Sequence, residues 1–156
     1  MAAPELATIL LVEDEISDAT LLRRAFASAH VLNPIVHLRN GDEALGYLAG
    51  VGEYSDRRRH PLPALILLDL KLPGMTGLQL LQWMRTERQL RRIPVVVLTL
   101  DESPSSINAA YDLGANSYLV KPGDPADVAL LVQSIQRYWM ELNQPPPLVM
   151  GAEGEA

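Results

Sequence analysis

The stretch that decides the fold is LILLDLKLPG, residues 65–74. Its first four residues form a continuous apolar run, and Pro73 and Gly74 are turn residues. A run of this kind is typical of a strand that is buried on both faces of a parallel sheet. Asp69 follows the run directly, and in open α/β sheets ligands bind beyond the carboxyl ends of the strands. Asp69 is therefore a candidate site residue, although a helix N-cap or a turn aspartate would occupy the same position.

Other strand-like segments follow this pattern, and segments with helical periodicity separate them. The five strand candidates are Thr8–Val12, Ile35–Leu38, Leu65–Leu68, Val95–Leu98 and Ser117–Val120. Between the first two, Ala19, Leu22 and Phe26 recur at helical spacing. Alternating β and α units predict a parallel sheet with right-handed crossovers and helices on both faces. The predicted fold class is α/β, a doubly wound five-stranded parallel sheet with strand order 2-1-3-4-5.

Two of the expected helices have clear start signals. Ser103-Pro104 and Asp124-Pro125 each combine an N-cap residue with a proline in the first turn. The helix that begins at Pro125 is expected to continue to about Leu142. Its expected buried stripe consists of Val128, Leu131, Val132, Ile135, Tyr138 and Leu142.

The composition restricts the classes of function. The chain has 156 residues, of which 48% are hydrophobic and 21% charged, an ordinary balance for a soluble globular protein. It has no cysteine, which excludes disulfides, thiolate zinc sites and thiol nucleophiles. The formal net charge of −6 argues against nonspecific binding of nucleic acid. No apolar stretch is long enough to span a membrane, and the N-terminus does not resemble a signal peptide, so we expect a cytoplasmic protein.

One domain is expected over residues 6–142. An N-terminal tail of residues 1–5 would precede it, and a Pro-rich, flexible tail of residues 143–156 would follow it. The connection Gly50–Pro63 is longer than most and contains Arg57-Arg58-Arg59-His60. We expect a solvated loop there, with a patch for docking a partner as the alternative.

Acidic, basic and hydroxyl side chains stand at the ends of the expected strands. Glu13 and Asp14 follow the first strand, Asp69 the third, Thr99 the fourth and Lys121 the fifth. With strand order 2-1-3-4-5 these ends converge, and clustered carboxylates repel one another unless a cation neutralises them. Oxygen ligands suit Mg²⁺, a lysine and a hydroxyl suit an anion, and aspartate can form an aspartyl-phosphate. The combination predicts metal-assisted phosphoryl transfer to Asp69, whereas each residue alone could be a helix cap, a strand-end hydroxyl or a solvated charge.

These motifs, in this order, resemble the receiver domain of two-component response regulators. The matching segments are Leu11-Val12-Glu13-Asp14, Leu68-Asp69 with Pro73 and Gly77, Leu98-Thr99, and Tyr118-Leu119-Val120-Lys121-Pro122. The resemblance covers about residues 6–142 and implies a flavodoxin-like receiver fold. It implies a phosphorelay signalling protein that accepts a phosphoryl group from a kinase phosphohistidine. Such a protein assists its own phosphorylation and dephosphorylation and is not a conventional enzyme.

The resemblance also implies which residues bind Mg²⁺. Asp69 would be both phosphoacceptor and ligand, Asp14 would bind the metal directly, and Glu13 would bind it through water. Lys71 would contribute its backbone carbonyl. The long side chain of Lys71 and the bulky Leu100 both depart from what is usual at the rim of such a site, which leaves the rates of phosphorylation and dephosphorylation open.

Three further residues are implied to respond to the phosphoryl group. Thr99 would donate a hydrogen bond to a phosphoryl oxygen, and Lys121 would pair with its charge. Tyr118 would be the aromatic switch residue. Its movement would repack the face made by the fourth helix, the fifth strand and the fifth helix.

The long loop, the segment Arg92–Thr99 and Tyr138-Trp139 resemble the stand-alone receivers that partner bacterial phytochrome histidine kinases. The expected partner is therefore a sensor histidine kinase, with a phytochrome-like kinase as the particular expectation. The last helix is apolar over more than one stripe, which favours a homodimer through this helix and the tail.

Three other classes of function are alternatives to the receiver. A phosphatase or phosphotransferase with an aspartyl nucleophile is the main alternative, although such enzymes commonly have a second Asp where this chain has Lys71. A nucleotide- or flavin-binding protein is disfavoured because the turn after the first strand is Glu13-Asp14-Glu15 and not a glycine-rich phosphate loop. A pseudo-receiver that acts only by binding is disfavoured because every acidic and basic site residue is present.

Overall fold

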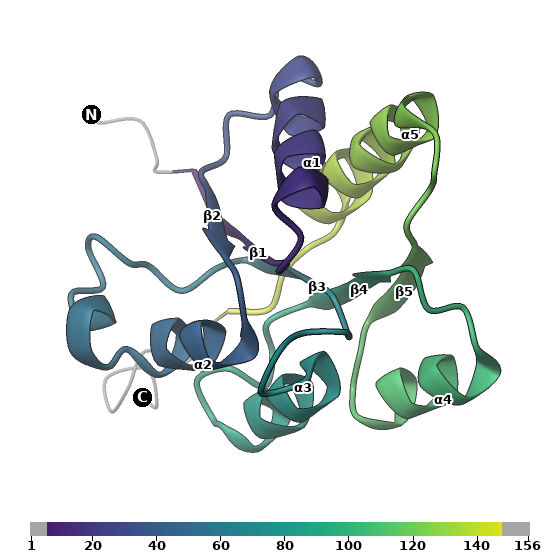
Figure 1. Cartoon of the computed structure of the whole chain (residues 1–156). Helices are drawn as coiled ribbons and strands as arrows, with labels where there is room; N and C mark the ends of the chain where they lie inside the picture. Colours follow the sequence, from purple (N-terminus) through teal and green to yellow (C-terminus); the bar gives the residue numbers. More distant parts are fainter. Residues whose placement is uncertain (1–5, 148–156) are drawn as a thin grey trace, which may run out of the picture.

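A computed structural model describes residues 6–147, so the expected tail at 1–5 and most of the tail at 143–156 lie outside the described residues. Five strands form one parallel sheet in the order β2-β1-β3-β4-β5, as predicted (Figure 1). The strands are β1 (Ile9–Val12), β2 (Ile35–Leu38), β3 (Leu65–Leu68), β4 (Val95–Thr99) and β5 (Ser117–Val120). Two predicted ends differ by one residue, because Thr8 precedes β1 and Thr99 belongs to β4.

Helices cover both faces of the sheet, with α1 and α5 on one face and α2, α3 and α4 on the other (Figure 1). Both predicted proline starts are confirmed, because Ser103 and Asp124 are N-cap residues whose side chains accept hydrogen bonds from backbone N–H groups. Within residues 6–147, none of the helices has the length and apolar content needed to cross a membrane. The helices are α1 (Ile16–Ser28), α2 (Gly41–Ala49), the short 3₁₀ helix η1 (Gly52–Tyr54), α3 (Gly77–Thr86), α4 (Pro104–Asp112), α5 (Pro125–Ile135) and the π-helix η2 (Gln136–Leu142).

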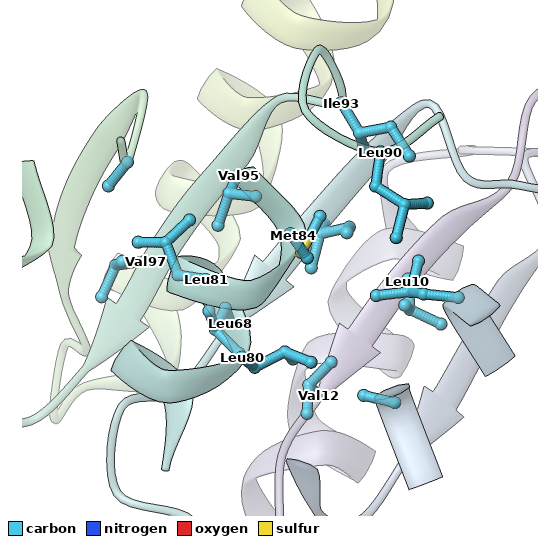
Figure 2. Packing of buried hydrophobic residues seen from close by; sticks show 14 of the residues in the cluster. Leu10, Val12, Leu68, Leu80, Leu81, Met84, Leu90, Ile93, Val95 and Val97 are labelled. Atoms are coloured by element: carbon cyan, nitrogen blue, oxygen red, sulfur yellow. The ribbon is translucent and has the colours of Figure 1, made fainter. Parts of the chain in front are cut away.

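The central strands are buried on both faces, which explains their unbroken apolar sequences. Ile66 and Leu68 pack on the side of α2 and α3, and Leu65 and Leu67 pack on the side of α1 and α5. Figure 2 shows the first of these two layers, in which Leu80 and other α3 side chains lie against the sheet. Each fully buried leucine contributes about 1.5–3 kcal/mol, so the two layers fix the sheet and the position of its carboxyl edge.

The last helix differs from the prediction in its second half. From Gln136 the backbone is π-helical, and the N–H of Asn143 donates to the carbonyl of Tyr138, five residues earlier, at 2.6 Å. The wider turn rotates the following side chains. Trp139 and Met140 pack against the core, whereas Tyr138 and Leu142 are 52% and 55% exposed. The expectation that these last two belong to the buried stripe is therefore wrong.

The long connection between α2 and β3 is only partly a solvated loop. Arg58 and Arg59 are exposed as expected, but Arg57 is half-buried. Its guanidinium donates to the carbonyls of Tyr47 and Leu48, both at 2.7 Å. These carbonyls belong to the last turn of α2, where the regular helical hydrogen bonds end, and the Tyr47 carbonyl also accepts from the N–H of Gly50 at 3.2 Å. Arg57 therefore anchors the loop to the end of α2.

Candidate functional site

Three carboxylates meet at the carboxyl ends of β1 and β3. These strands are neighbours and pair Val12 with Leu68, so Glu13 and Asp69 leave the sheet side by side. One oxygen atom from each of Glu13, Asp14 and Asp69 lies within 4.8 Å of the others. Glu13 and Asp69 are buried, with 1% and 6% of their surfaces exposed, and Asp14 is half-buried. The structure thus brings together the predicted acidic residues.

A lysine from the end of β5 neutralises part of this charge. The Lys121 Nζ atom lies 2.9 Å from Asp69 Oδ2 and 3.0 Å from Asp18 Oδ2, and it also contacts Glu13 Oε1. The Lys121 side chain is only 10% exposed. Burial acts to lower the pKa of Lys121, but the hydrogen bonds to Glu13, Asp69 and Asp18 outweigh it and raise the pKa above its usual value. Lys121 is therefore a fixed positive charge beside Asp69.

The loop after β3 shapes the other side of Asp69. The backbone N–H of Lys71 donates to Asp69 Oδ1 at 3.2 Å. Gly77, the first residue of α3, has no side chain because a Cβ atom there would collide with the backbone carbonyl of Asp69. The Lys71 side chain is exposed, and Leu100 is 67% exposed at the end of β4. Both side chains extend into solvent, so on this side Asp69 is held by backbone contacts.

Thr99 and Tyr118 lie on the adjacent strands β4 and β5. Thr99 is buried, and its Oγ1 accepts a hydrogen bond from the N–H of Asp101 at 3.5 Å. The Tyr118 hydroxyl donates to the backbone carbonyl of Asp101, and the half-buried ring packs against the core. Hydrogen bonds from Ser106 and Ser103 lower the pKa of Asp101 to about 2. The loop that precedes α4 therefore contacts both Thr99 and Tyr118 through the backbone of Asp101.

Two residues at the site were not predicted from the sequence. Asp18, in the first turn of α1, binds Lys121 as described above. His37 on β2 donates from Nε2 to the backbone carbonyl of Glu13 at 2.7 Å. This hydrogen bond helps to fix the backbone of the turn that carries Glu13 and Asp14. The only sequence signal for Asp18 is its position four residues after Asp14, close to one helical turn. Acidic residues in the first turn of a helix are so common that this spacing is not specific.

The burial of Glu13 should make stability depend on pH. Burial raises the pKa of Glu13 from about 4.5 to about 7, although its hydrogen bond with Lys121 opposes the change. Between about pH 4.5 and pH 7, the folded protein therefore keeps a proton on Glu13 that the unfolded chain releases. This contribution is complete below about pH 4.5 and is lost as the pH rises through about 7. Relative to Glu13→Gln, the wild type should lose on the order of 1–3 kcal/mol of unfolding free energy across this window, measured by urea unfolding without divalent cations. Parallel pH profiles for the two proteins would contradict this assignment.

The acidic cluster has the donor atoms that a hard divalent cation requires. All three side chains offer carboxylate oxygens, and Mg²⁺ and Mn²⁺ favour oxygen ligands. Glu13 and Asp69 are also held in place, by Lys121 and by the N–H of Lys71. The residues therefore fit a divalent cation, with Glu13, Asp14 and Asp69 as the groups that would hold it.

The fold and this site define a class of protein. Residues 9–133 match the response regulator receiver domain, and the chain belongs to this family. It is 38% identical over 133 residues to the response regulator Rcp1 of Synechocystis sp., covering 85% of this chain and 88% of Rcp1. It is 39% identical over 138 residues to the probable methanogenesis regulatory protein FilR2 of Methanothrix harundinacea, covering 88% of this chain and 86% of that protein.

Solved structures point to the same group of receivers. The phosphorylated cyanobacterial phytochrome response regulator RcpA superposes with a TM-score of 0.85 at 35% identity, covering 91% of this chain and 99% of RcpA. The Mn²⁺-bound form of Rcp1 superposes with a TM-score of 0.82 at 36% identity, covering 90% of this chain and 99% of Rcp1. The chain is therefore a response regulator receiver close to Rcp1 and RcpA.

Proposed function

We propose that this chain is a response regulator that accepts a phosphoryl group on Asp69 from a histidine kinase in a Mg²⁺-dependent reaction. The receiver unit comprises residues 6–142. The observation that carries the proposal is the geometry of Asp69: it is buried, shares an acidic cluster with Glu13 and Asp14, and lies 2.9 Å from Lys121 Nζ. A carboxylate nucleophile needs positive charge close by, here from Lys121 and from a metal ion held by the acidic cluster. This positive charge offsets the negative charge of the incoming phosphoryl group.

In the proposed reaction an oxygen of the Asp69 carboxylate forms a bond to phosphorus while the bond from phosphorus to the donor's histidine nitrogen breaks. That nitrogen leaves with the bonding electron pair. Mg²⁺, bound by Asp14 and Asp69, by Glu13 through water and by the Lys71 carbonyl, would supply positive charge to the phosphoryl oxygens. Lys121 pairs with the phosphoryl charge, and Thr99 donates a hydrogen bond to it. Tyr118 then moves with the loop that contains Asp101, because its hydroxyl binds that loop.

The test is phosphorylation by a small donor. We expect incubation with Mg²⁺ and acetyl phosphate to add one phosphoryl group, detected by intact mass, and we expect a metal chelator to prevent it. A wild-type chain without an adduct, under conditions in which another receiver is modified, would contradict the proposal. The main alternative, a phosphatase or phosphotransferase, is disfavoured because the position two residues after Asp69 is occupied by the exposed Lys71 and not by an acid.

We further propose a phytochrome-like sensor kinase as partner and the cytoplasm as location. The support is the similarity to RcpA, which is described as a phytochrome response regulator. The similarity to FilR2 is comparable in identity, so candidate kinases should include others. The test compares the rates at which candidate kinases transfer a phosphoryl group to this chain. The kinase with the fastest transfer is the partner. The acidic charge of −6 supports action through proteins and not through nucleic acid.

A homodimer through the last helix and its tail is also proposed. Leu130, Tyr138 and Leu142 are 61%, 52% and 55% exposed on α5 and η2, so the last helix presents apolar side chains that a second copy of the chain would cover. We expect light scattering to give twice the chain mass at micromolar concentration. Replacing Tyr138 and Leu142 with Ser should produce monomers, and replacing the exposed Val51, which follows α2 on the other face of the sheet, should not. A monomeric wild type, with or without phosphorylation, would contradict the dimer.

A further inference from the structure

Lys121 has one carboxylate partner that is not part of the acidic cluster. Its Nζ atom lies 3.0 Å from Asp18 Oδ2 and 2.9 Å from Asp69 Oδ2. Within residues 6–147, the cluster able to hold a metal ion contains Glu13, Asp14 and Asp69 but not Asp18. Asp18 belongs to α1, which packs against α5. This packing fixes the backbone of Asp18 independently of the loops that carry the acidic cluster.

The other two partners of Lys121 have a second task under the proposed function. Glu13 and Asp69 would bind the metal ion, and Asp69 would also accept the phosphoryl group. An ammonium group and a divalent cation repel each other, so the two cannot share the same carboxylate oxygens without loss. Lys121 is largely buried, and its three N–H donors require acceptors. A third acceptor outside the cluster would keep the ammonium group in the site.

We propose that Asp18 is a positioning residue of the phosphoacceptor site. It holds the Lys121 ammonium group beside Asp69 while Glu13 and Asp69 bind the metal ion and the phosphoryl group. The inference rests on the proposed function and deepens it, because it assigns the residue that keeps Lys121 available to the phosphoryl oxygens. Asp18 is 37% exposed, which allows its carboxylate to follow small movements of Lys121.

Replacing Asp18 should change the affinity for an anionic ligand in the direction opposite to that expected from the loss of a negative charge alone. A carboxylate that was only a neighbour would repel an anionic ligand, so its removal would strengthen binding of that ligand. If Asp18 positions Lys121, its removal instead weakens binding. We expect Asp18→Asn to reduce the affinity for beryllofluoride, an analogue of the phosphoryl group, by about threefold to tenfold in saturating Mg²⁺, the effect of one partly exposed charged hydrogen bond. Asp18→Ala should reduce it at least as much, because Asn retains a weaker acceptor.

The experiment is titration calorimetry of the full chain with beryllofluoride, with Glu15→Gln as the matched control. Glu15 is an exposed carboxylate beside the cluster, and its side chain is not a partner of Lys121. The control should bind as well as the wild type or better. Titration with Mg²⁺ alone gives the concentration that saturates each variant, and urea unfolding should show both variants folded.

Each result separates the inference from the proposed function. Weaker beryllofluoride binding in both Asp18 variants, with unchanged or stronger binding in the control, supports the inference. Unchanged or stronger binding in the Asp18 variants overturns it and leaves the proposed function intact. Failure of the wild type itself to bind beryllofluoride with Mg²⁺ overturns the proposed function and the inference together.

Discussion

Asp69→Asn will form no phosphoryl adduct with acetyl phosphate and Mg²⁺ under conditions that modify the wild type. We expect the rate to fall by at least roughly a hundredfold, because the neutral amide that replaces the carboxylate is a poor nucleophile. The fold should survive the change. Asp69 accepts from the Lys71 N–H at Oδ1 and from the Lys121 ammonium group at Oδ2, and the single Asn oxygen can keep one of these two hydrogen bonds. Removing one negative charge from a cluster of three carboxylates offsets part of the loss.

The control for this prediction is Glu15→Gln, which removes an exposed carboxylate from the same edge of the sheet and should be phosphorylated as the wild type is. Intact mass with time gives both rates, and circular dichroism shows whether each variant is folded. An adduct that persists in folded Asp69→Asn would show that another carboxylate is the phosphoacceptor. The proposed role of Asp69 would then be wrong.

Lys121→Met will destabilise the protein strongly at pH 8 when divalent cations are absent. The substitution leaves Glu13 and Asp69 buried without the ammonium group that contacts both. Removing one partner of a buried ion pair lowers the unfolding free energy by about 3–5 kcal/mol, and Lys121 is buried enough for this range to apply. Saturating Mg²⁺ should restore most of the loss, because a divalent cation can neutralise the same carboxylates. Lower pH should restore part of it, since Glu13 then becomes protonated.

Urea unfolding at pH 5 and pH 8, with and without Mg²⁺, tests this prediction. Lys71→Met is the matched control, because Lys71 is an exposed lysine two residues after Asp69. Its unfolding free energy should change by less than about 1 kcal/mol. A loss in Lys121→Met that is the same at both pH values and insensitive to Mg²⁺ would show that the aliphatic part of Lys121, and not its charge, is what matters.

The sheet and its order could be predicted because burial leaves the central strands little freedom of composition. Leu65–Leu68 and Val95–Leu98 are apolar at every position, and only a strand covered on both faces requires that. The strand ends then determine the site. Once Asp69 follows one central strand and Lys121 the edge strand, parallel pairing places them at one edge, and the structure has them 2.9 Å apart.

The features that could not be predicted depend on contacts between residues distant in the sequence, or on a local change of helix type. Neither leaves a recognisable pattern in the neighbouring residues. Asp18 is an ordinary acidic residue in a first helical turn until Lys121 is placed beside it. Arg57 was expected in solvent because its partners are backbone carbonyls, which every residue has. The exposure of Tyr138 and Leu142 was missed because the expected stripe assumed the period of an α-helix to the end.

The π-helical segment Gln136–Leu142 has a consequence for how this chain compares with its relatives. A π-helical turn corresponds to an α-helix with one additional residue, and such turns are frequent at functional sites. A receiver whose last helix is α-helical throughout would need a one-residue gap near this segment to align with this chain. Where no gap is introduced, Met140, which packs against the core five residues after Ile135, would be matched with a residue that faces solvent. A single additional residue at this point of a helix therefore changes which side chains face outward, while the carboxyl edge of the sheet, where α5 begins, is left unchanged.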